Sequence, residues 1–499
     1  MKRTLSLFFC VIFFISVFVC RAAAASAEDE GTAASDEAVL HVPQIRVVTE
    51  NGNGTTLQKE DGYVNASIEI TDTDGSVLSD SVLFKVRGNG TALASIQKKA
   101  FTFKFDKKRE VLGLGKGKKW AMLANAMDTS LLRTYVTMEL GHAMDLPFTS
   151  DHRMIELWVD DSFRGLYELI EPVQEGTDRV NIDIKSNDGM KDFLLEREKG
   201  RTEDGVSYIR PGGIRFAVSE PEEPTPEQLT YINNVMNDIV DKLKNGTQEE
   251  ISAVLDTDSF AKFYILNEYV KTSDFDFSSV FFYYKDGKLY AGPPWDYDHS
   301  MGSCGDLDIY QEINGTEGAY VNNMHFYQYL CQYEWFMDEV REIYAMNRDY
   351  IRNIAIDGGQ IDTLAEEYSA EIERNFTETP WKVTKQWSIY QKKPLPTYQE
   401  NLDFFKDWCQ KRFAWLDHYL TEEKRPYRIG DADGDDEVTI IDATVIQRTL
   451  ADIETPDYSE EAADADQDGE VTVVDATCVQ RYIAQLNAPE GIGSLNTEL

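Results

Sequence analysis

The middle of the sequence carries acidic residues whose spacing suits phosphoryl-transfer chemistry. Asp296 and Asp298 alternate in the run Trp295-Asp296-Tyr297-Asp298, and upstream of them Asp274 lies in the turn Ser273-Asp274-Phe275-Asp276. Phosphoryl transfer needs a divalent metal held by carboxylates and an Asp that orients the acceptor hydroxyl. The two acidic segments supply the residue types for both tasks.

The same chemistry needs a cation for the phosphates, and lysines cluster on an upstream segment. Lys104 lies between Phe103 and Phe105, shortly after Lys98 and Lys99. Strand alternation places Lys104 on the face opposite the phenylalanines, from which its amine could reach a cleft. These residues are also typical of a capped turn, solvated acids and an exposed strand face. Spacing alone leaves both interpretations open.

A second chemistry is encoded near the C-terminus, where an acidic loop occurs twice. In each copy, side-chain oxygens at loop positions 1, 3, 5, 9 and 12 and a carbonyl at position 7 suit Ca²⁺, which takes about 6 to 8 oxygens. We therefore predict two calcium sites. Their residues are Asp431, Asp433, Asp435, Glu437, Thr439 and Asp442 in the first loop, and Asp464, Asp466, Asp468, Glu470, Thr472 and Asp475 in the second.

The two loops differ at position 6, which is Asp436 in the first and Gly469 in the second. This position needs a sharp turn that glycine adopts freely and Asp adopts at some cost. We expect the first site to be the weaker. A solvated acidic tail would explain neither the repeated register nor the helices expected after each loop, at residues 443–450 and 476–483.

The composition and the N-terminal segment limit the partners and the location that are expected for the protein. The 499 residues include 88 acidic and 49 basic ones, a formal net charge of −39, which disfavours nucleic acid and anionic membranes as partners. Lys2 and Arg3, a largely apolar stretch over residues 5–20 and the small residues Ala25-Ser26-Ala27 predict a signal peptide over residues 1–27 and hence secretion. No later segment is long and apolar enough to span a bilayer.

Four cysteines follow the predicted signal peptide: Cys304, Cys331, Cys409 and Cys478. Their wide spacing excludes a disulfide scaffold, and no CxxC or Cys/His cluster indicates zinc. One bridge within the main domain stays open.

The elements that must position these residues change from strands to helices along the chain. Short alternating runs predict antiparallel strands at residues 45–48, 63–70, 81–87 and 100–105, followed later by a β meander at 154–170. Helical spacing predicts helices at residues 129–144, 225–244 and 258–271. A hairpin of residues 280–284 and 288–291 leads into the acidic pair, and residues 303–420 are mainly helical. This order indicates a two-lobed α+β fold.

Several stretches resemble the CotH-like family of secreted atypical protein kinases, in family order over roughly residues 45–422. They are Val86-Arg87-Gly88-Asn89-Gly90, Lys98-Lys99-Ala100-Phe101, Lys119-Trp120-Ala121-Met122-Leu123, Asp128-Thr129-Ser130-Leu131-Leu132-Arg133, Gly165-Leu166-Tyr167-Glu168-Leu169-Ile170-Glu171 and Gly292-Pro293-Pro294-Trp295-Asp296-Tyr297-Asp298. The resemblance implies a kinase-like domain with a β-rich N-lobe and a mainly helical C-lobe, which uses ATP and Mg²⁺ or Mn²⁺.

The resemblance also implies roles for individual residues. Asp274 matches the catalytic-loop Asp, and Asp296 matches the metal-binding Asp. Lys99 or Lys104 would hold the ATP phosphates, while Arg87, Arg133 and Glu171 would line the site or brace the lobes. Where active members can have an Asn shortly after the catalytic Asp, this chain has Ser278-Ser279, and Ser is a poorer magnesium ligand. Asp276 or Asp298 could compensate, with Ser279 as a weak ligand.

The C-terminal repeats resemble type I dockerins, whose duplicated calcium loop-helix units attach a secreted protein to a cohesin on a scaffold. Both loops, the Asp-Ala-Thr start of each helix, and Gln447-Arg448 echoed by Gln480-Arg481 carry the resemblance. Exposed aliphatic pairs there would be unusual on a surface that binds nothing. The candidate cohesin contacts are Ile440, Ile441, Gln447, Arg448, Val473, Val474, Gln480 and Arg481.

The expected organisation is a signal peptide (1–27), an acidic linker (28–42), a CotH-like kinase domain (43–422), a short linker (423–427), a small all-α dockerin (428–487) and a tail (488–499). The leading hypothesis is a secreted kinase that transfers phosphate from ATP to Ser or Thr of an unknown protein, attached to the scaffold of a cellulosome-type complex. The alternatives are a catalytically inactive kinase-like subunit and a polysaccharide-active hydrolase, whose two carboxylates would have to lie about 5 to 9.5 Å apart.

Overall fold

The computed structural model describes residues 40–88, 96–177, 179–184, 191–421, 427–435, 437–451, 453, 455 and 458–496. The predicted signal peptide, almost all of the acidic linker and Asp436 lie outside these ranges. So do Asn89 and Gly90 of the first family motif and most of the linker at residues 423–427.

The first part of the chain forms a closed β-barrel with the strand order β1-β2-β3-β4-β5-β7-β6. Neighbouring strands are antiparallel, except that β1 pairs in parallel with β6 and so closes the barrel. Alternate residues point inward, and Phe84, Phe103 and Trp120 are fully buried. The strands are β1 (Gln44–Thr49), β2 (Val64–Thr71), β3 (Val77–Arg87), β4 (Ala100–Glu110), β5 (Lys116–Leu123), β6 (His152–Val159) and β7 (Ser162–Ile170).

A second sheet follows the barrel, with the order β12-β11-β8-β10-β9. One face, with Phe193 and Phe216, packs on Ile232 and Met236 of helix α3. The opposite face, with Leu194, Phe281 and Tyr283, joins Ala121 and Leu123 from the outer side of β5. The sheet therefore lies between the helices and the barrel. Its strands are β8 (Phe193–Arg197), β9 (Tyr208–Ile209), β10 (Phe216–Glu220), β11 (Phe281–Lys285) and β12 (Lys288–Ala291).

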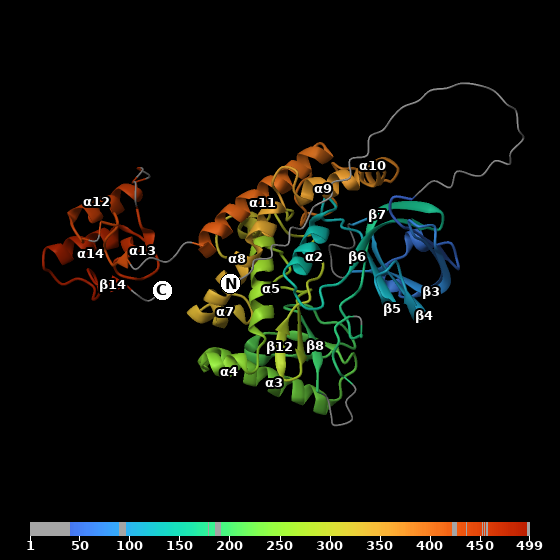
Figure 1. Cartoon of the computed structure of the whole chain (residues 1–499), viewed down its shortest axis with the longest axis horizontal. Helices are drawn as coiled ribbons and strands as arrows, with labels where there is room; N and C mark the ends of the chain where they lie inside the picture. Colours follow the sequence, from blue (N-terminus) through green and yellow to red (C-terminus); the bar gives the residue numbers. More distant parts are fainter. Residues whose placement is uncertain are drawn as a thin grey trace, which may run out of the picture. The chain divides into compact units, whose positions relative to one another are not determined.

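The rest of the large domain is helical, and α5 packs against both α8 and α11 (Figure 1). Arg412 of α11 donates to Glu268 of α5 at 2.6 Å, and both side chains are fully buried. The helices are α2 (Arg133–Ala143), α3 (Pro226–Asn245), α4 (Gln248–Ser252), α5 (Thr257–Val270), α6 (Gln311–Asn314), α7 (Tyr327–Leu330), α8 (Glu334–Asn353), α9 (Gln360–Glu367), α10 (Ser369–Thr377) and α11 (Tyr398–Thr421). Short 3-10 turns are η1 (Gly54–Thr56), η2 (Lys59–Asp61), η3 (Pro211–Gly213) and η4 (Asp308–Tyr310).

The local signals for the helices are largely confirmed. Thr225 accepts from the backbone N–H of Gln228 in a capping box at the start of α3, and Asp256 caps α5. Helix α2 begins later than expected, at Arg133. In the preceding turn, Asp128 accepts from the N–H groups of Ser130 and Arg133.

The C-terminal unit contains two similar helices, α12 (Ile440–Thr449) and α14 (Val473–Ile483), packed on each other. A short helix α13 (Glu460–Ala463) lies between them in sequence, and β13 (Tyr427–Arg428) pairs with β14 (Leu495–Asn496). Its core includes Ala443, Ile446, Ala476 and Val479. The unit is therefore not all-α as expected, because a two-stranded pairing joins its ends.

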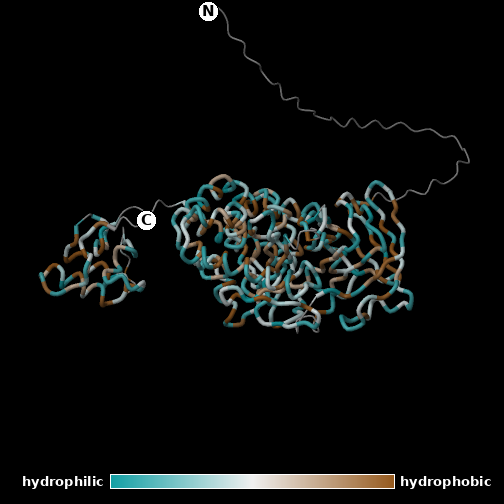
Figure 2. Tube along the Cα trace, turned by 90° about the horizontal axis from the view of Figure 1, so that it is seen from below, coloured by the Kyte–Doolittle hydropathy of each residue, from teal (hydrophilic) through white to brown (hydrophobic). Residues whose placement is uncertain are grey.

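Hydrophobic and hydrophilic stretches alternate along the chain (Figure 2). Among the described helices, none is long and apolar enough to cross a membrane. Cys304, Cys331, Cys409 and Cys478 are all free, so the bridge left open by the sequence is not formed. Together the parts make an α+β chain, β-rich at first and helical later, followed by the small C-terminal unit.

Candidate functional site

Two loops bring Asp274 and Asp296 into one electrostatic environment. Helix α5 ends at Lys271, which has a left-handed backbone (φ 45°), and Asp274 lies in the loop that follows. Asp296 lies in the loop after strand β12, and its charge acts on Asp274. The two loops are bonded to each other. The Ser273 N–H donates to the His299 carbonyl at 3.1 Å, and the Ser273 hydroxyl lies 2.5 Å from His299 Nδ1.

His299 links these loops as a neutral side chain. Its Nε2 lies 2.6 Å from the Tyr390 carbonyl, which can only accept, so Nε2 carries the proton and Nδ1 accepts from Ser273. Burial lowers the pKa of His299 to about 4, so the ring stays neutral at physiological pH. A neutral imidazole thus holds the segment that carries Asp274 against the segment that carries Asp296.

Both candidate carboxylates are in strained electrostatic positions. Burial raises the pKa of Asp274 to about 7, with a further contribution from the negative charge of Asp296. Burial also raises the pKa of Asp296, against the opposing charge of Arg87. Within the described ranges, neither carboxylate has a hydrogen-bond or ion-pair partner. Two sheltered carboxylates without donors suit a hard divalent cation such as Mg²⁺ or Mn²⁺.

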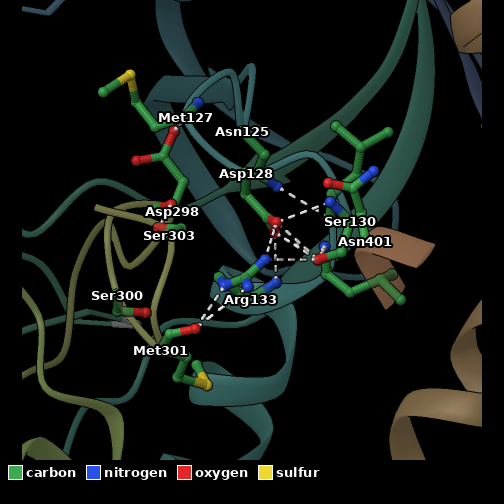
Figure 3. Close-up of polar contacts among 12 residues, drawn as sticks. Asn125, Met127, Asp128, Ser130, Arg133, Asp298, Ser300, Met301, Ser303 and Asn401 are labelled. Carbon is green, nitrogen blue, oxygen red and sulfur yellow. Dashed lines mark hydrogen bonds and ion pairs between the residues drawn. The ribbon is translucent and has the colours of Figure 1, made fainter. Parts of the chain in front are cut away.

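Asp298 is more strongly engaged by the protein. Its Oδ2 accepts from the Met127 N–H at 3.1 Å (Figure 3). Burial, followed by the negative charge of Asp296, raises its pKa well above the usual range. One oxygen of Asp298 therefore stabilises the loop before α2, which leaves the other for a ligand.

Arg133 braces the site from α2. Its guanidinium is buried, pairs with Asp128 and donates to the Met301 carbonyl at 3.2 Å through Nη2 and 3.3 Å through Nε (Figure 3). Met301 follows the acidic run by only a few residues. The buried pair therefore fixes the start of α2 against the loop that carries Asp298. Of the two roles considered for Arg133, its contacts match bracing.

A group of cations lies on the outer face of the barrel, and one of them, Arg87, acts on Asp296. The Arg87 guanidinium lies 4.6 Å from the centre of the Trp295 ring, and Asp296 and Glu196 offset the lowering of its pKa by burial. Lys85 and Lys119 lie close by. Burial and then the charge of Arg87 lower the pKa of both amines. Such mutual repulsion among cations is relieved when an anion binds.

Lys85 and Lys119 were missed as candidates in the sequence. A signal for Lys85 was available, because it lies two residues before Arg87 on the same face of β3. Lys119 was part of a quoted family stretch but was not assigned a role, since its strand, β5, was not predicted.

The predicted phosphate-binding lysines are placed differently from one another. Lys104 is exposed on the outer face of β4, opposite Lys119 in the register of β4 and β5. Burial lowers the pKa of Lys99, and the negative charge of Glu60 opposes this. Neither contributes to the shifted pKa of Asp274, Asp296 or Asp298. Lys98, which was not chosen, is buried and donates to the Leu166 carbonyl at 2.7 Å.

Glu171 and Asp276 are held by basic partners. Glu171 accepts from Arg179 Nε at 2.9 Å, and Arg179 also donates to the Lys119 carbonyl at 2.8 Å, which matches a bracing role for Glu171. Asp276 accepts from Arg197 at 3.0 Å and Lys199 at 2.5 Å. With both oxygens engaged, Asp276 is a poor replacement for the missing Asn.

The Ser278-Ser279 segment is also occupied. Ser278 Oγ accepts from Arg201 Nη2 at 2.8 Å. The Ser279 N–H donates to Glu196 Oε1 at 3.2 Å, and Ser279 has a left-handed backbone (φ 62°). Glu196 and Arg201 therefore contact the two serines that stand where active family members can have an Asn. Neither residue was singled out from the sequence.

The two acidic loops of the C-terminal unit fold alike. The carboxylates of Asp431, Asp433 and Asp435 gather within 4.8 Å of one another, and those of Asp464, Asp466 and Asp468 do the same. Burial and neighbouring carboxylates raise the pKa of Asp433 and of Asp466. A divalent cation would offset this repulsion.

Asp442 and Asp475 each serve a loop and a helix. Oδ2 of Asp442 accepts from the Thr439 N–H at 2.7 Å, and Oδ2 of Asp475 accepts from the Thr472 N–H at the same distance. Their Oδ1 atoms accept from the N–H groups of Asp433 and Asp466, each at 3.2 Å. Glu437, Thr439, Glu470 and Thr472 lie in their predicted loop positions.

The predicted docking residues lie on the surface of the C-terminal unit. The four aliphatic side chains are 57% (Ile440), 54% (Ile441), 67% (Val473) and 51% (Val474) exposed. Gln447, Arg448, Gln480 and Arg481 are also exposed, one to two helical turns further along. Each helix start therefore presents an aliphatic pair followed by a polar pair.

Comparisons with known families match both parts of the chain. The family described as "CotH kinase protein" matches residues 84–416, more than half of the chain. The family described as "Dockerin type I domain" matches residues 429–484. No curated protein matches the chain. Dockerin domains bind calcium and attach to cohesins, and dockerin proteins are typically extracellular and attached to a scaffold.

Proposed function

Because the chain belongs to the CotH kinase protein family and carries a type I dockerin, we propose that it is a secreted protein kinase displayed on a cohesin scaffold. It would transfer phosphate from ATP to Ser or Thr of a protein. Its two lobes would be the barrel with its adjoining sheet and the helical part. The predicted signal peptide supports secretion, and the dockerin supports attachment.

The observation that carries this proposal is that Asp274 and Asp296, two buried carboxylates without hydrogen-bond partners in the described residues, lie near several cationic side chains. Asp296 would hold Mg²⁺ or Mn²⁺, and the ion would neutralise charge on the nucleotide phosphates. Asp274, in its ionised form, would accept a hydrogen bond from the acceptor hydroxyl and orient it. Arg87, Lys85 and Lys119 would bind the phosphates, with Lys104 and Lys99 as further candidates.

Nucleotide binding is the sharpest test. The full chain is expected to show a rise in Tm with ATP and Mg²⁺ or Mn²⁺, and to transfer labelled phosphate to itself or to generic protein acceptors. Asp296→Ala should abolish the metal-dependent part of the shift. Lys107→Ala, which changes an exposed lysine on β4, is the matched control. No ATP-dependent shift and no transfer by the unaltered protein would exclude the kinase assignment.

A second candidate is a catalytically inactive kinase-like subunit of the scaffold complex. The Ser278-Ser279 departure favours it, because neither hydroxyl is a good magnesium ligand. This candidate predicts cohesin binding with neither nucleotide binding nor phosphate transfer. Cohesin binding by a chain that shows no ATP-dependent shift and no transfer would support it over the kinase.

A further inference from the structure

The surroundings of Ser278 and Ser279 do not suit a second metal ion. In protein kinases, two Mg²⁺ ions are held by the metal-binding Asp and by an Asn five residues after the catalytic Asp. That Asn position corresponds to Ser279 in this chain. Of the two acids that could compensate, Asp276 is bound by Arg197 at 3.0 Å and Lys199 at 2.5 Å, and Asp298 accepts from the Met127 N–H at 3.1 Å with one of its oxygens. At Ser279 and Asp276, the ligands for a second ion are therefore missing or engaged.

A guanidinium contacts this segment of the chain. Arg201 donates to Ser278 Oγ at 2.8 Å and pairs with Glu198 at 3.7 Å, and its side chain is 33% exposed. Its positive charge acts on Asp274 and on Glu196, which in turn accepts from the Ser279 N–H at 3.2 Å. Its Nε is buried without a hydrogen-bond partner in the described part of the chain.

We propose that this site binds one divalent cation per nucleotide, and that Arg201 supplies the positive charge that a second metal ion provides elsewhere. The inference rests on the proposed nucleotide binding. Arginine suits the role because it is permanently charged and matches phosphate geometry with several donors. Cationic side chains and Mg²⁺ act on phosphoryl groups through the same electrostatic effect.

The test counts metal ions on the intact protein. Mn²⁺ bound per nucleotide is measured by electron paramagnetic resonance in the presence of a non-hydrolysable ATP analogue. The unaltered chain should bind one Mn²⁺ per nucleotide. Arg201→Gln should weaken binding of the Mn²⁺-nucleotide by about tenfold to a hundredfold, as expected for loss of a charged hydrogen-bond donor. Arg201→Lys should restore part of that loss, and Arg210→Gln, an exposed neighbour, should change nothing.

A double variant provides the complementary result. Arg201→Ser with Ser279→Asn removes the guanidinium and installs an amide ligand, and Asn tolerates the left-handed backbone of residue 279. This variant should bind two Mn²⁺ per nucleotide. Two ions on the unaltered chain, or an Arg201→Gln variant with unchanged affinity, would overturn the inference while leaving nucleotide binding intact. Absence of nucleotide binding in the unaltered chain would instead overturn the proposed function.

Discussion

The Arg87 guanidinium stacks on the Trp295 ring at 4.6 Å, and the residue after Trp295 is Asp296. A strand of the barrel and the loop after β12 thereby meet at one charged contact. The stack fixes a cation beside the carboxylate proposed to hold the metal. Packing of the barrel beside the loop after β12 therefore also brings together residues of the candidate site.

Substituting Arg87 should weaken nucleotide binding more than substituting either lysine predicted from the sequence. We expect Arg87→Gln to lower affinity for Mg²⁺-ATP by about tenfold to a hundredfold, since a charged hydrogen bond is lost. Lys119→Ala should have a similar effect, whereas Lys104→Ala should stay near the unaltered value. Calorimetric titration measures all three. A larger effect at Lys104 than at Lys119 would restore the assignment suggested by the sequence.

Neutralising Asp274 should stabilise the metal-free protein at high pH. Its pKa is raised to about 7 in the folded chain, against about 3.9 in an unfolded one. Between these values the folded state binds the extra proton, so this group makes stability fall as pH rises through that window. The Tm of Asp274→Asn should therefore exceed that of the unaltered protein by a margin that grows from about pH 4 to pH 7. A margin independent of pH would contradict the raised pKa.

Breaking the buried pair of Asp128 and Arg133 should destabilise the large domain. Asp128→Ala leaves an uncompensated buried guanidinium and should cost about 3 to 5 kcal/mol of unfolding free energy. All eight tryptophans lie within residues 120–415, so fluorescence during urea unfolding reports this domain alone. Replacing both residues, as Asp128→Ala with Arg133→Met, should cost less than Asp128→Ala. A double variant no more stable than the single would argue against an ionic contribution.

The second calcium loop should contribute more to docking than the first. Gly469 takes a left-handed backbone (φ 91°) without strain, whereas Asp436 stands at the matching position of the first loop. A left-handed Asp costs on the order of 1 kcal/mol, or about fivefold in affinity. Asp464→Ala should therefore weaken binding to a type I cohesin more than Asp431→Ala across a calcium titration. The reverse order would refute this ranking.

Either of the two docking faces should be able to bind a cohesin when the aliphatic pair of the other is disrupted. Ile441→Asp or Val474→Asp alone should leave one aliphatic pair intact and retain most of the cohesin affinity. The double variant should lose at least about thirtyfold, the effect of an interface hot spot. Both side chains are more than half exposed, so neither change should alter the Tm. Strong loss from one single variant would show that only one face binds.

Local signals in the sequence predicted most helices and strands, but they could not predict which strands pair with each other over long sequence distances. The hairpin before Asp296 and the repeated acidic loops were both recognisable because the residues responsible are neighbours in sequence. Strand β5 was missed, since Lys116, Lys118 and Lys119 mask its alternation. Barrel closure depends on the parallel pairing of β1 with β6, more than a hundred residues apart, which no local pattern specifies.

The site was only partly predictable for the same reason. Asp274 and Asp296 were chosen from a local motif and a local turn, and in the structure the charge of Asp296 acts on Asp274. Glu196 and Arg201 come from β8 and the segment after it, and they reach Ser278 and Ser279 through the pairing of β8 with β11. That pairing is set by tertiary packing.

The double duty of Asp442 and Asp475 has a consequence for when the protein can join its scaffold. Each carboxylate closes an acidic loop and caps the helix that carries the predicted docking side chains, so binding of calcium would be coupled to formation of the helix start. We expect the helix starts and the aliphatic pairs to lose their fixed geometry where calcium is scarce. Attachment to a scaffold would then wait until the chain reaches calcium-rich surroundings.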